Sequence, residues 1–513
     1  HIHPSATGFP PRSLLVPYLE CVMPAASPEF ILLLLANVAG IAGVTLSRNS
    51  GESEETWPPE VSSGPLYPWS GSSGNRFCTS AVRSSAPQAL RSKPSWTFRV
   101  GEERLEVPGA AGSVAATPLV DDQLNIYLSV VSGSIHKISP EGKILWTHQR
   151  PPLARLPGAP TLMDGSLFSA DTSGTVFALD MRTGATRWSQ YTGLPVGDDA
   201  WSVAAGEGVV VVPFVNPAYI DTRGQRNRRF GVFIASVGAP LWFHESKDGD
   251  PFVNMLVSIR KGSLFFTDSA AVIHRMDLYT GEQKWKAKAK KDIAPTASGV
   301  AISPKGDVVF ATWNEVGFQL GDVHGVVAAF DSVNGKLLWS HALEYPTVGQ
   351  PAVGTLGSGP TATLAVVVAA GTSPLKPHGV LTAFGNQSKA SVVGISAEGP
   401  GAGTLLFSRD LERRSGAAAA GSGQPSACAP RTAFSTPTIS GNGAIYLGFE
   451  NGDLAILHDD NADMSFESSE VDLYNVGAAF NAAPVLAPGM LIAAPCDGLH
   501  VWRWQDGATP VAM

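Results

Sequence analysis

Residues 174–190 read GTVFALDMRTGATRWSQ, and this order of residue types recurs along the chain. Between residues 175 and 180 apolar side chains alternate with others, which is the period-two pattern of a half-buried strand. Asp180 can accept hydrogen bonds from backbone amides of the turn that follows. Gly184 can adopt the left-handed conformation that closes a short loop, and a second strand then carries Trp188. The stretch therefore predicts a β-hairpin, which would be marginally stable alone.

The hairpin pattern is repeated along most of the sequence. Each copy has an alternating run, a polar turn and a large aromatic residue. Two short runs, GVLTAF at 379–384 and GTLLFS at 403–408, are interpreted as one copy split by an insertion. The other copies occupy residues 133–147, 174–190, 231–243, 271–286, 325–340 and 452–467. Self-similarity at this spacing is the signature of a repeat architecture.

Two further strand signals precede the hairpins. One is a short segment with small residues and often proline, such as GAPTLM at 158–163. The other is an apolar run, such as SLFSAD at 166–171. Together they give roughly four strands in each of about eight units, and four-stranded units repeated radially form a β-propeller. The predicted fold class is therefore all-β, an eight-bladed β-propeller of four-stranded blades.

The last unit has no fourth strand before the chain ends. A tryptophan-bearing strand, WTFRV from Trp96 to Val100, precedes the first unit and has no hairpin partner of its own. We expect this N-terminal strand to complete the last blade and to close the ring. Such pairing removes two exposed sheet edges, which promote aggregation.

One aromatic side chain in each unit is expected to pack between blades. These residues stand at the equivalent position of each repeat, where a large side chain can be buried. They are Trp96, Trp146, Trp188, Trp242, Trp285, Trp339, Phe407 and Phe466.

The repeated unit of Gly, alternating run, Asp, Gly and Trp resembles the pyrroloquinoline-quinone-type repeat over residues 95–504. The chain has no Trp-Asp dipeptide, which disfavours the Trp-Asp repeat type. The quinone-type repeat builds quinoprotein alcohol dehydrogenases and non-catalytic relatives. Those relatives include the bacterial outer-membrane assembly lipoprotein and luminal propellers of the secretory pathway. A shared fold does not carry a shared site, so the resemblance implies the fold first.

For the dehydrogenases the resemblance implies a quinone held above the central channel, a calcium ion, a catalytic aspartate, a tryptophan floor and commonly a disulfide between adjacent cysteines. The four cysteines of this chain are not adjacent, and no motif places the aspartate or the calcium ligands. We therefore expect no catalytic residue, no metal and no cofactor, and a non-catalytic scaffold for protein or ligand binding. The alternative is a pyrroloquinoline-quinone-dependent alcohol or sugar dehydrogenase with a divergent site.

One acidic stretch imitates a calcium loop, because Asp459, Asn461 and Asp463 follow the spacing of an EF-hand. Met464, however, occupies the position where that loop requires glycine. The repeat alignment instead places the stretch in the hairpin turn of a blade. No metal site is therefore predicted there.

The composition suits a large, turn-rich β protein without nucleic-acid partners. The 513 residues are 44% hydrophobic and 16% charged, with 54 Gly and 39 Pro, so the chain can bury a large core. The formal net charge of -8 gives no electrostatic reason to bind nucleic acid. The lysine-rich run at 284–291 is interpreted as the solvated face of an outer strand.

The N-terminal region differs from the repeats. From Phe30 to Leu46 the chain is apolar throughout, which fits the hydrophobic segment of a signal peptide and a membrane anchor equally well. The predicted domains are 1–46 for this signal or anchor, 47–94 for a disordered Ser/Gly/Pro-rich linker and 95–513 for the propeller. We expect the protein in the secretory pathway, in an organelle lumen or anchored to a membrane.

Binding residues are expected on one face of the propeller. Neighbouring strands are antiparallel, so the connection between the second and third strands of a blade lies on the same face as the links between blades. Insertions lengthen this connection at 215–230, 313–324 and 371–378, and binding residues concentrate on such loops. We call it the long-loop face, and the alternative is that its insertions are tolerated surface loops. The residues expected to contact a protein partner or a small ligand are Asp198, Asp199, Trp201, Arg223, Arg226, Arg228, Arg229, Trp313 and Asn314.

Overall fold

The computed structural model describes most of the chain after residue 66. The described residues are 67–100, 113–196, 202–215, 227–246, 256–288, 293–294, 299–316, 323–347, 349–357, 362–371, 389–412 and 434–504. The chain divides into two compact units, and all described residues belong to the second, Val61–Met513. The predicted signal or anchor segment lies outside them. Within the described ranges, no helix is long and apolar enough to cross a membrane.

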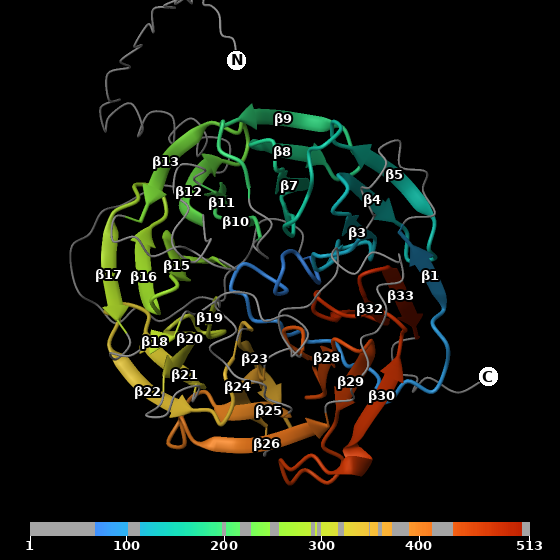
Figure 1. Ribbon diagram of the computed structural model, residues 1–513, viewed down its shortest axis with the longest axis vertical. Coiled ribbons are helices and arrows are strands. Elements are labelled where there is room, and N and C mark those ends of the chain that lie inside the picture. Colours follow the sequence, from blue (N-terminus) through green and yellow to red (C-terminus); the bar gives the residue numbers. More distant parts are fainter. Residues whose placement is uncertain are drawn as a thin grey trace, which may run out of the picture. The chain divides into compact units, whose positions relative to one another are not determined.

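The described strands form eight antiparallel sheets, which are arranged as blades round a common axis (Figure 1). Seven of these sheets have four strands, and the fifth blade has five because two short strands both pair with the same long strand. The strands of a blade follow one another outward, and the last strand of each blade lies at the rim. The predicted all-β, eight-bladed propeller is confirmed.

The first four blades follow the order of the chain. Blade one consists of β2 (Leu119–Val120), β3 (Ile126–Ser129), β4 (Ser134–Ile138) and β5 (Ile144–Gln149). Blade two consists of β6 (Thr161–Met163), β7 (Ser166–Ala170), β8 (Thr175–Asp180) and β9 (Thr186–Tyr191). Blade three consists of β10 (Ala204–Gly206), β11 (Val209–Val215), β12 (Asn227–Ile234) and β13 (Pro240–Glu245). Blade four consists of β14 (Ser258–Arg260), β15 (Ser263–Thr267), β16 (Val272–Asp277) and β17 (Gln283–Lys288).

The last four blades include the two irregular ones. Blade five consists of β18 (Ile293–Ala294), β19 (Val300–Ile302), β20 (Val308–Val316), β21 (Val323–Asp331) and β22 (Leu337–Ala342). Blade six consists of β23 (Ala352–Leu356), β24 (Thr363–Ala370), β25 (Lys389–Ser396) and β26 (Leu405–Glu412). Blade seven consists of β27 (Thr438–Ile439), β28 (Ile445–Gly448), β29 (Asp453–Leu457), the short 3-10 helix η3 (Ser468–Glu470) and β30 (Val471–Asn475). Blade eight consists of β31 (Val485–Ala487), β32 (Met490–Ala493), β33 (Gly498–Arg503) and β1 (Trp96–Arg99).

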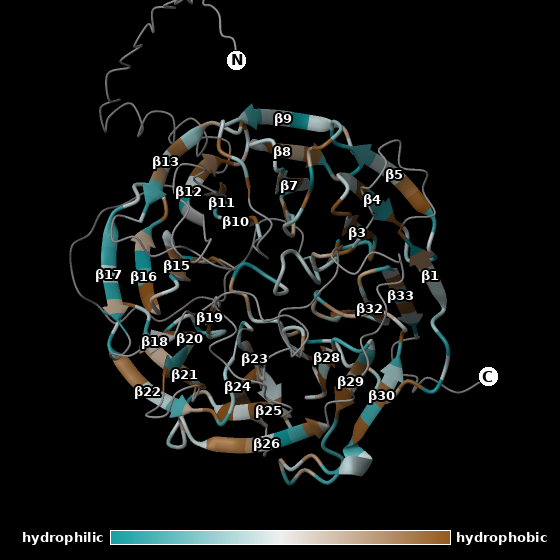
Figure 2. Ribbon diagram, in the orientation of Figure 1, coloured by the Kyte–Doolittle hydropathy of each residue, from teal (hydrophilic) through white to brown (hydrophobic). Residues whose placement is uncertain are grey.

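The core lies within and between the inner strands of the blades. All five residues of β7 are buried, whereas the outer strand β9 alternates between exposed and half-buried residues. This difference follows from the pleat, because successive side chains of a rim strand point to opposite faces and only one face meets the neighbouring blade. The lysine-rich β17 is such an outer strand and is mostly hydrophilic (Figure 2).

The N-terminal strand pairs with the C-terminal blade. Trp96 of β1 lies opposite Val501 of β33, and Arg99 lies opposite Gly498. The strand predicted from Trp96 to Val100 therefore occupies the fourth position of blade eight.

Blade six differs from the predicted strand assignment. Its third strand is β25, in which Gly394 lies opposite Phe407 of β26. The run at 379–384 that was assigned to this strand lies outside the described residues. Alternation alone could not separate the two candidates, because both runs have the same period.

Parts of the predicted long loops are strands. β20 and β21 pair along their whole length, and Val316 lies opposite Val323. Residues 313–316 and 323–324 of the predicted loop therefore belong to the hairpin, and residues 317–322 lie outside the described residues. β12 likewise begins at Asn227, inside the predicted loop at 215–230.

Residues 67–94 are packed into the propeller, although they were predicted as part of a disordered linker. Trp69 is fully buried and exchanges two backbone hydrogen bonds with Val120 of blade one. This part of the chain is therefore not a linker, because its main chain is bonded to the blades. The remainder of the predicted linker, 47–66, lies outside the described residues.

Candidate functional site

Part of the predicted long-loop face can be located. Asp198, Asp199, Trp201, Arg223 and Arg226 lie outside the described residues. Arg228 and Arg229 belong to β12, and Nη2 of Arg229 is 2.6 Å from Oε2 of Glu245 in β13. The Arg229 side chain is therefore held at the edge of blade three by an ion pair.

Trp313 and Asn314 are buried in β20. Only 4% of Trp313 is exposed, and its Nε1 donates a hydrogen bond to Oε1 of Glu315 at 3.0 Å. Asn314 donates from Nδ2 to the carbonyl oxygen of Thr347, and its Oδ1 accepts from the Thr347 N–H, both at 2.8 Å. In this structure neither side chain is presented to a partner. The physical reason is that β20 continues past its predicted end, so both residues lie inside a blade.

Six of the predicted aromatic residues make one contact between neighbouring blades. Each is a tryptophan of an outer strand whose indole N–H donates to a backbone carbonyl in the hairpin turn of the next blade. The pairs are Trp146 with Met181, Trp188 with Ala235, Trp242 with Leu278, Trp285 with Ser332, Trp339 with Ala397, and Trp96 with Pro140, at 2.7 to 3.4 Å. The last pair joins blade eight to blade one.

A glycine in each receiving turn makes this approach possible. Gly238 has φ +74°, and a Cβ added there would lie 2.4 Å from Cε3 of Trp188. A Cβ at Gly184 would lie 2.8 Å from Cδ2 of Trp146. Glycine is therefore required both for its left-handed backbone and for its missing side chain. The recurring Gly and Trp of the sequence are the two sides of one inter-blade contact.

Phe407 and Phe466 form a different contact. Their rings pack edge-on with centroids 4.5 Å apart, across the junction of blades six and seven. The repeat alignment placed Phe466 in the outer strand of blade seven, but that strand is β30, and Phe466 precedes η3. The alignment failed here because the connection between β29 and β30 is longer than the other hairpin turns. Phe466 is thus the turn-side partner of Phe407.

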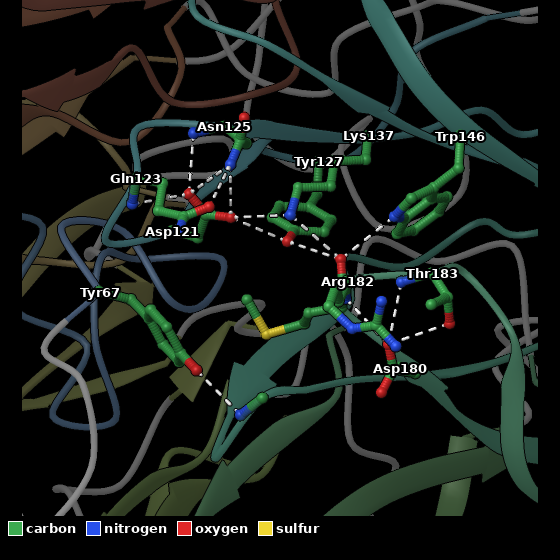
Figure 3. A network of polar contacts seen from close by, with 12 residues as sticks. Tyr67, Asp121, Gln123, Asn125, Tyr127, Lys137, Trp146, Asp180, Arg182 and Thr183 are labelled. Atoms are coloured by element: carbon green, nitrogen blue, oxygen red, sulfur yellow. Dashed lines mark hydrogen bonds and ion pairs between the residues drawn. The ribbon is translucent and has the colours of Figure 1, made fainter.

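A buried polar network lies beside Trp146, between blades one and two (Figure 3). At its centre is Asp121, whose Oδ1 accepts hydrogen bonds from the backbone N–H and Nδ2 of Asn125. The Asp121 Oδ2 is 2.9 Å from the Tyr127 hydroxyl and 3.2 Å from Nζ of Lys137. A buried charge requires such pairing, because an isolated one is costly to remove from water.

The carbonyl oxygen of Met181 joins this network to the next blade. It accepts hydrogen bonds from Tyr127 Oη, Lys137 Nζ and Trp146 Nε1, at 3.1 to 3.3 Å. Burial raises the pKa of Tyr127 far above its ordinary value, and the Asp121 carboxylate raises it further, so the phenol stays protonated. The network therefore links two blades through groups that are already paired with one another. Its contacts hold blades one and two together.

The described residues contain no group of three or more His, Cys, Asp or Glu side chains that could hold a metal ion. Cys78 is a buried free thiol, and burial raises its pKa above the ordinary value. Cys496 is disulfide-bonded.

The axis of the ring is filled by the chain's own N-terminal residues, drawn in blue in Figure 1. We call residues 69–84 the axial segment. Its backbone carbonyls accept hydrogen bonds from the innermost strands of several blades, for example at Ser70 from Leu162 and at Thr79 from Val353. Sequence reasoning missed this segment. The signal that could have indicated it is the pair Tyr67 and Trp69, two large aromatic residues within a Ser/Gly-rich run.

The axial segment is relevant to the quinone cofactor that the resemblance to the dehydrogenases implies. In the resembling dehydrogenases the quinone is held above the central channel. Here the inward-facing N–H groups of Val120 and Leu162 already donate to carbonyls of the axial segment. These two N–H groups are therefore already paired with the chain's own carbonyls.

The comparisons with known proteins agree with the repeat and the fold. Residues 59–287 match the family model described as outer membrane protein assembly factor BamB. A curated relative, the outer membrane protein assembly factor BamB of Legionella pneumophila (strain Paris), is 27% identical over 190 residues. That match covers 35% of this chain and 47% of the relative, so the chain matches about half of the relative's length.

Solved structures of both classes superpose on the propeller. BamB from Moraxella catarrhalis gives a TM-score of 0.51 at 16% identity and covers 83% of this chain and 99% of its own. The quinohemoprotein alcohol dehydrogenase of Comamonas testosteroni gives 0.53 at 14% identity, covering 86% and 82%. A europium-containing methanol dehydrogenase gives 0.56 at 12% identity, covering 84% and 90%. At these identities the likeness shows the fold alone. The chain is thus an eight-bladed β-propeller whose fold is similar both to BamB and to the quinoprotein dehydrogenases.

Proposed function

We propose that this protein is a non-catalytic scaffold that binds a protein partner on its long-loop face and uses no quinone or metal. The observation that supports the proposal is the axial segment, whose carbonyls accept hydrogen bonds from the inward-facing N–H groups of the innermost strands. The buried network round Asp121 also supports a non-catalytic scaffold, because its polar groups are paired with one another and join two blades. A matching relative is named for assembly rather than for a reaction.

The described part of the long-loop face offers two strongly exposed apolar side chains. Leu153, in the link between blades one and two, is 80% exposed, and Tyr191, at the end of β9, is 70% exposed. Both flank blade two on the face where the links between blades run. Tyrosine is enriched at protein interfaces because it offers a large apolar ring with a polar tip. We propose that these two side chains belong to the contact surface.

Affinity capture with the full-length chain tests this surface. The variant Leu153→Ser/Tyr191→Ser is compared with the wild type and with Val237→Ser/Val333→Ser. Val237 and Val333 are 60% and 71% exposed and lie in hairpin turns on the opposite face, so they are a matched control. We expect the partner to be retained by the wild type and the control and to bind the first variant at least about tenfold more weakly. Equal retention by all three proteins would contradict the proposed surface.

A second experiment tests the enzymatic alternative. The full-length chain is titrated calorimetrically with pyrroloquinoline quinone and Ca²⁺, and dye reduction is then measured with alcohols and sugars. We expect neither binding nor turnover. Saturable binding with turnover would make the protein a dehydrogenase.

We also propose a cellular compartment for this protein. Disulfides persist in oxidising compartments and are rare in the cytosol, and Cys496 is disulfide-bonded. We therefore propose the secretory pathway or an organelle lumen as its location. Mass spectrometry of the protein isolated from its source, without reduction, should detect the disulfide at Cys496, and a fully reduced thiol there would contradict this location.

A further inference from the structure

The ring offers a circle of backbone donors to the axial segment. In six blades, one N–H of the innermost strand donates to a carbonyl of this segment, among the residues that the structure describes. The donors in ring order are Val120, Leu162, Ile259, Ile302, Val353 and Ile439, and the acceptors in chain order are Trp69, Ser70, Arg76, Phe77, Thr79 and Ser80, at 2.7 to 3.0 Å. The axial segment therefore winds round the axis in the same order as the blades.

Between its ends the axial segment pairs several of its N–H groups internally. The Ser70 N–H donates to the carbonyl of Gly74, and the Ser80 N–H donates to that of Ser73, whereas the Trp69 and Val82 N–H groups donate to Val120 and Ile439 of the ring. The six acceptor carbonyls named above face outward toward the ring. This arrangement needs a left-handed backbone at Gly74, with φ +89°, and at Cys78 and Ser80, with φ of 56° and 47°. Such conformations at non-glycine residues persist only where the surroundings determine them strongly.

Side chains add further contacts. The six donor residues of the ring are all apolar, but two other ring side chains bond the segment: Thr161 Oγ1 donates to the Ser70 carbonyl at 3.0 Å, and Ser258 Oγ donates to the Phe77 carbonyl at 3.2 Å. From the segment, Ser73 Oγ donates to Oε1 of Gln350 at 2.6 Å, and Arg76 lies 3.6 Å from Glu207. The ring therefore bonds main-chain carbonyls of the segment with both backbone and side-chain donors, as in proteins that bind an extended peptide through its backbone.

We infer that the axis of this propeller is a peptide-binding site that recognises main-chain carbonyls, and that residues 69–84 are its resident ligand. The class of ligand is a looped peptide whose carbonyls point outward round a circle. The same segment supplied as a separate molecule has this chemistry. The inference does not depend on which partner the long-loop face binds.

Hydrogen exchange on the full chain tests the circle of donors. The six donor amides should exchange at least about 100-fold more slowly than amides of an unstructured peptide. Gly74→Ala should accelerate them together, because alanine is strained at φ +89°. The matched control is Gly193→Ala, at φ +69° with nothing within 4 Å of the added Cβ, and it should leave them unchanged. Donor amides that exchange at unstructured rates in the wild type would overturn the inference.

A second measurement asks whether the segment behaves as a ligand. A protease recognition sequence is placed within residues 101–112 of the full chain, and the folded protein is cleaved. A fluorescent synthetic peptide of residues 67–100 is added in excess. Urea is present at a concentration below the unfolding transition, so that the cut N-terminal fragment can dissociate and the peptide can replace it. We expect the labelled peptide to bind the propeller saturably and the unlabelled peptide to compete with it.

The control is the same peptide with Ser80→Pro. Proline fixes φ near about −65°, so this peptide cannot adopt the left-handed backbone at residue 80 and should not be incorporated. Incorporation of both peptides, or of neither, would overturn the inference. Displacement of the labelled peptide by pyrroloquinoline quinone with Ca²⁺ would overturn it too, by assigning the axis to a small ligand.

Discussion

At the scale of single residues, the contact between Trp188 and the turn of blade three can be measured directly. The indole N–H donates to the carbonyl of Ala235 at 2.7 Å, and the ring covers the backbone of Gly238. Trp188→Ala removes both the hydrogen bond and the packing, so we expect the free energy of unfolding to fall by about 3 kcal/mol in urea denaturation. Tyr191→Ala, in the same strand but exposed, should change it by less than about 0.5 kcal/mol. Equal losses in the two variants would contradict an inter-blade role for Trp188.

The glycine side of the same contact gives a second prediction. Gly238→Ala combines backbone strain with a clash against Trp188, whereas Gly193→Ala brings similar strain without a clash. We expect Gly238→Ala to lower the free energy of unfolding by about 1–3 kcal/mol more than Gly193→Ala does. In the Trp188→Ala background this extra cost should disappear, which a double-mutant cycle measures as coupling. Additive costs would show that the two residues do not form one contact.

Asp180 supplies a prediction about pH. Its hydrogen bond with Arg187, at 2.9 Å, lowers the pKa of Asp180 to about 2, helped by hydrogen bonds from Thr183. Because the folded pKa lies below the unfolded one, the stabilisation is complete above about pH 4 and is lost as the pH falls through about 2. The pair is partly exposed, so its contribution should stay below about 1 kcal/mol.

The variant Asp180→Asn isolates this contribution. It keeps an acceptor for the turn but loses the charge that pairs with Arg187. In urea denaturation it should be less stable than the wild type at pH 6 and should approach the wild type near pH 2. A difference that does not change with pH would contradict the assigned pKa.

At the scale of elements, the junction of blades seven and eight is built differently from the others. Its outer strand β30 has no tryptophan. Residues 86–92 lie there instead, and we call them the strap. The strap's bonds are Tyr446 Oη to the Pro87 carbonyl, Trp502 Nε1 to the Ser92 carbonyl and the Leu90 N–H to the Asp472 carboxylate. An N-terminal segment thus takes the place of a docked side chain.

The variant Tyr446→Phe tests the strap. It removes one buried donor and should lower the free energy of unfolding by about 1 kcal/mol. It should also speed limited proteolysis within residues 84–95. The control is Tyr279→Phe, which removes a similar hydrogen bond to the carbonyl of Glu207 between blades four and three. Equal cleavage rates in the two variants would show that the strap is not held by Tyr446.

Whether the sequence predicts a part of the fold depends on whether side-chain or main-chain atoms hold that part in place. The alternation predicted β8, which runs from Thr175 to Asp180, because side-chain burial defines a strand in a sheet. The path of the axial segment was missed, since its bonds to the ring use main-chain carbonyls that every residue has, and only Tyr67 and Trp69 mark it in the sequence. Trp313 was expected to be exposed because it was assigned to a long connection. The continued pairing of β20 and β21 instead buries it.

At the scale of the whole molecule, the ring depends on how its two ends meet. Among the strand pairs of the described blades, β1 with β33 has the largest separation in sequence, because it joins residue 96 to residue 501 across nearly the whole propeller. Trp96 then docks on blade one, with Nε1 2.8 Å from the Pro140 carbonyl oxygen. The strand β1 therefore contacts the last blade through a strand pair and the first blade through an indole hydrogen bond.

A disulfide across β1 and β33 would test closure. Thr97 lies directly opposite His500, so Thr97→Cys/His500→Cys can form a cross-link that closes a loop through all eight blades. The control is Thr175→Cys/Tyr191→Cys, a directly opposed pair within blade two that closes a short loop. Because a longer closed loop removes more entropy from the unfolded chain, oxidation should stabilise the first variant by about 2 kcal/mol more than the second in urea denaturation. If the ring is open in solution, the first pair will remain reduced under conditions that oxidise the second, and β1 will have no part in holding the propeller together.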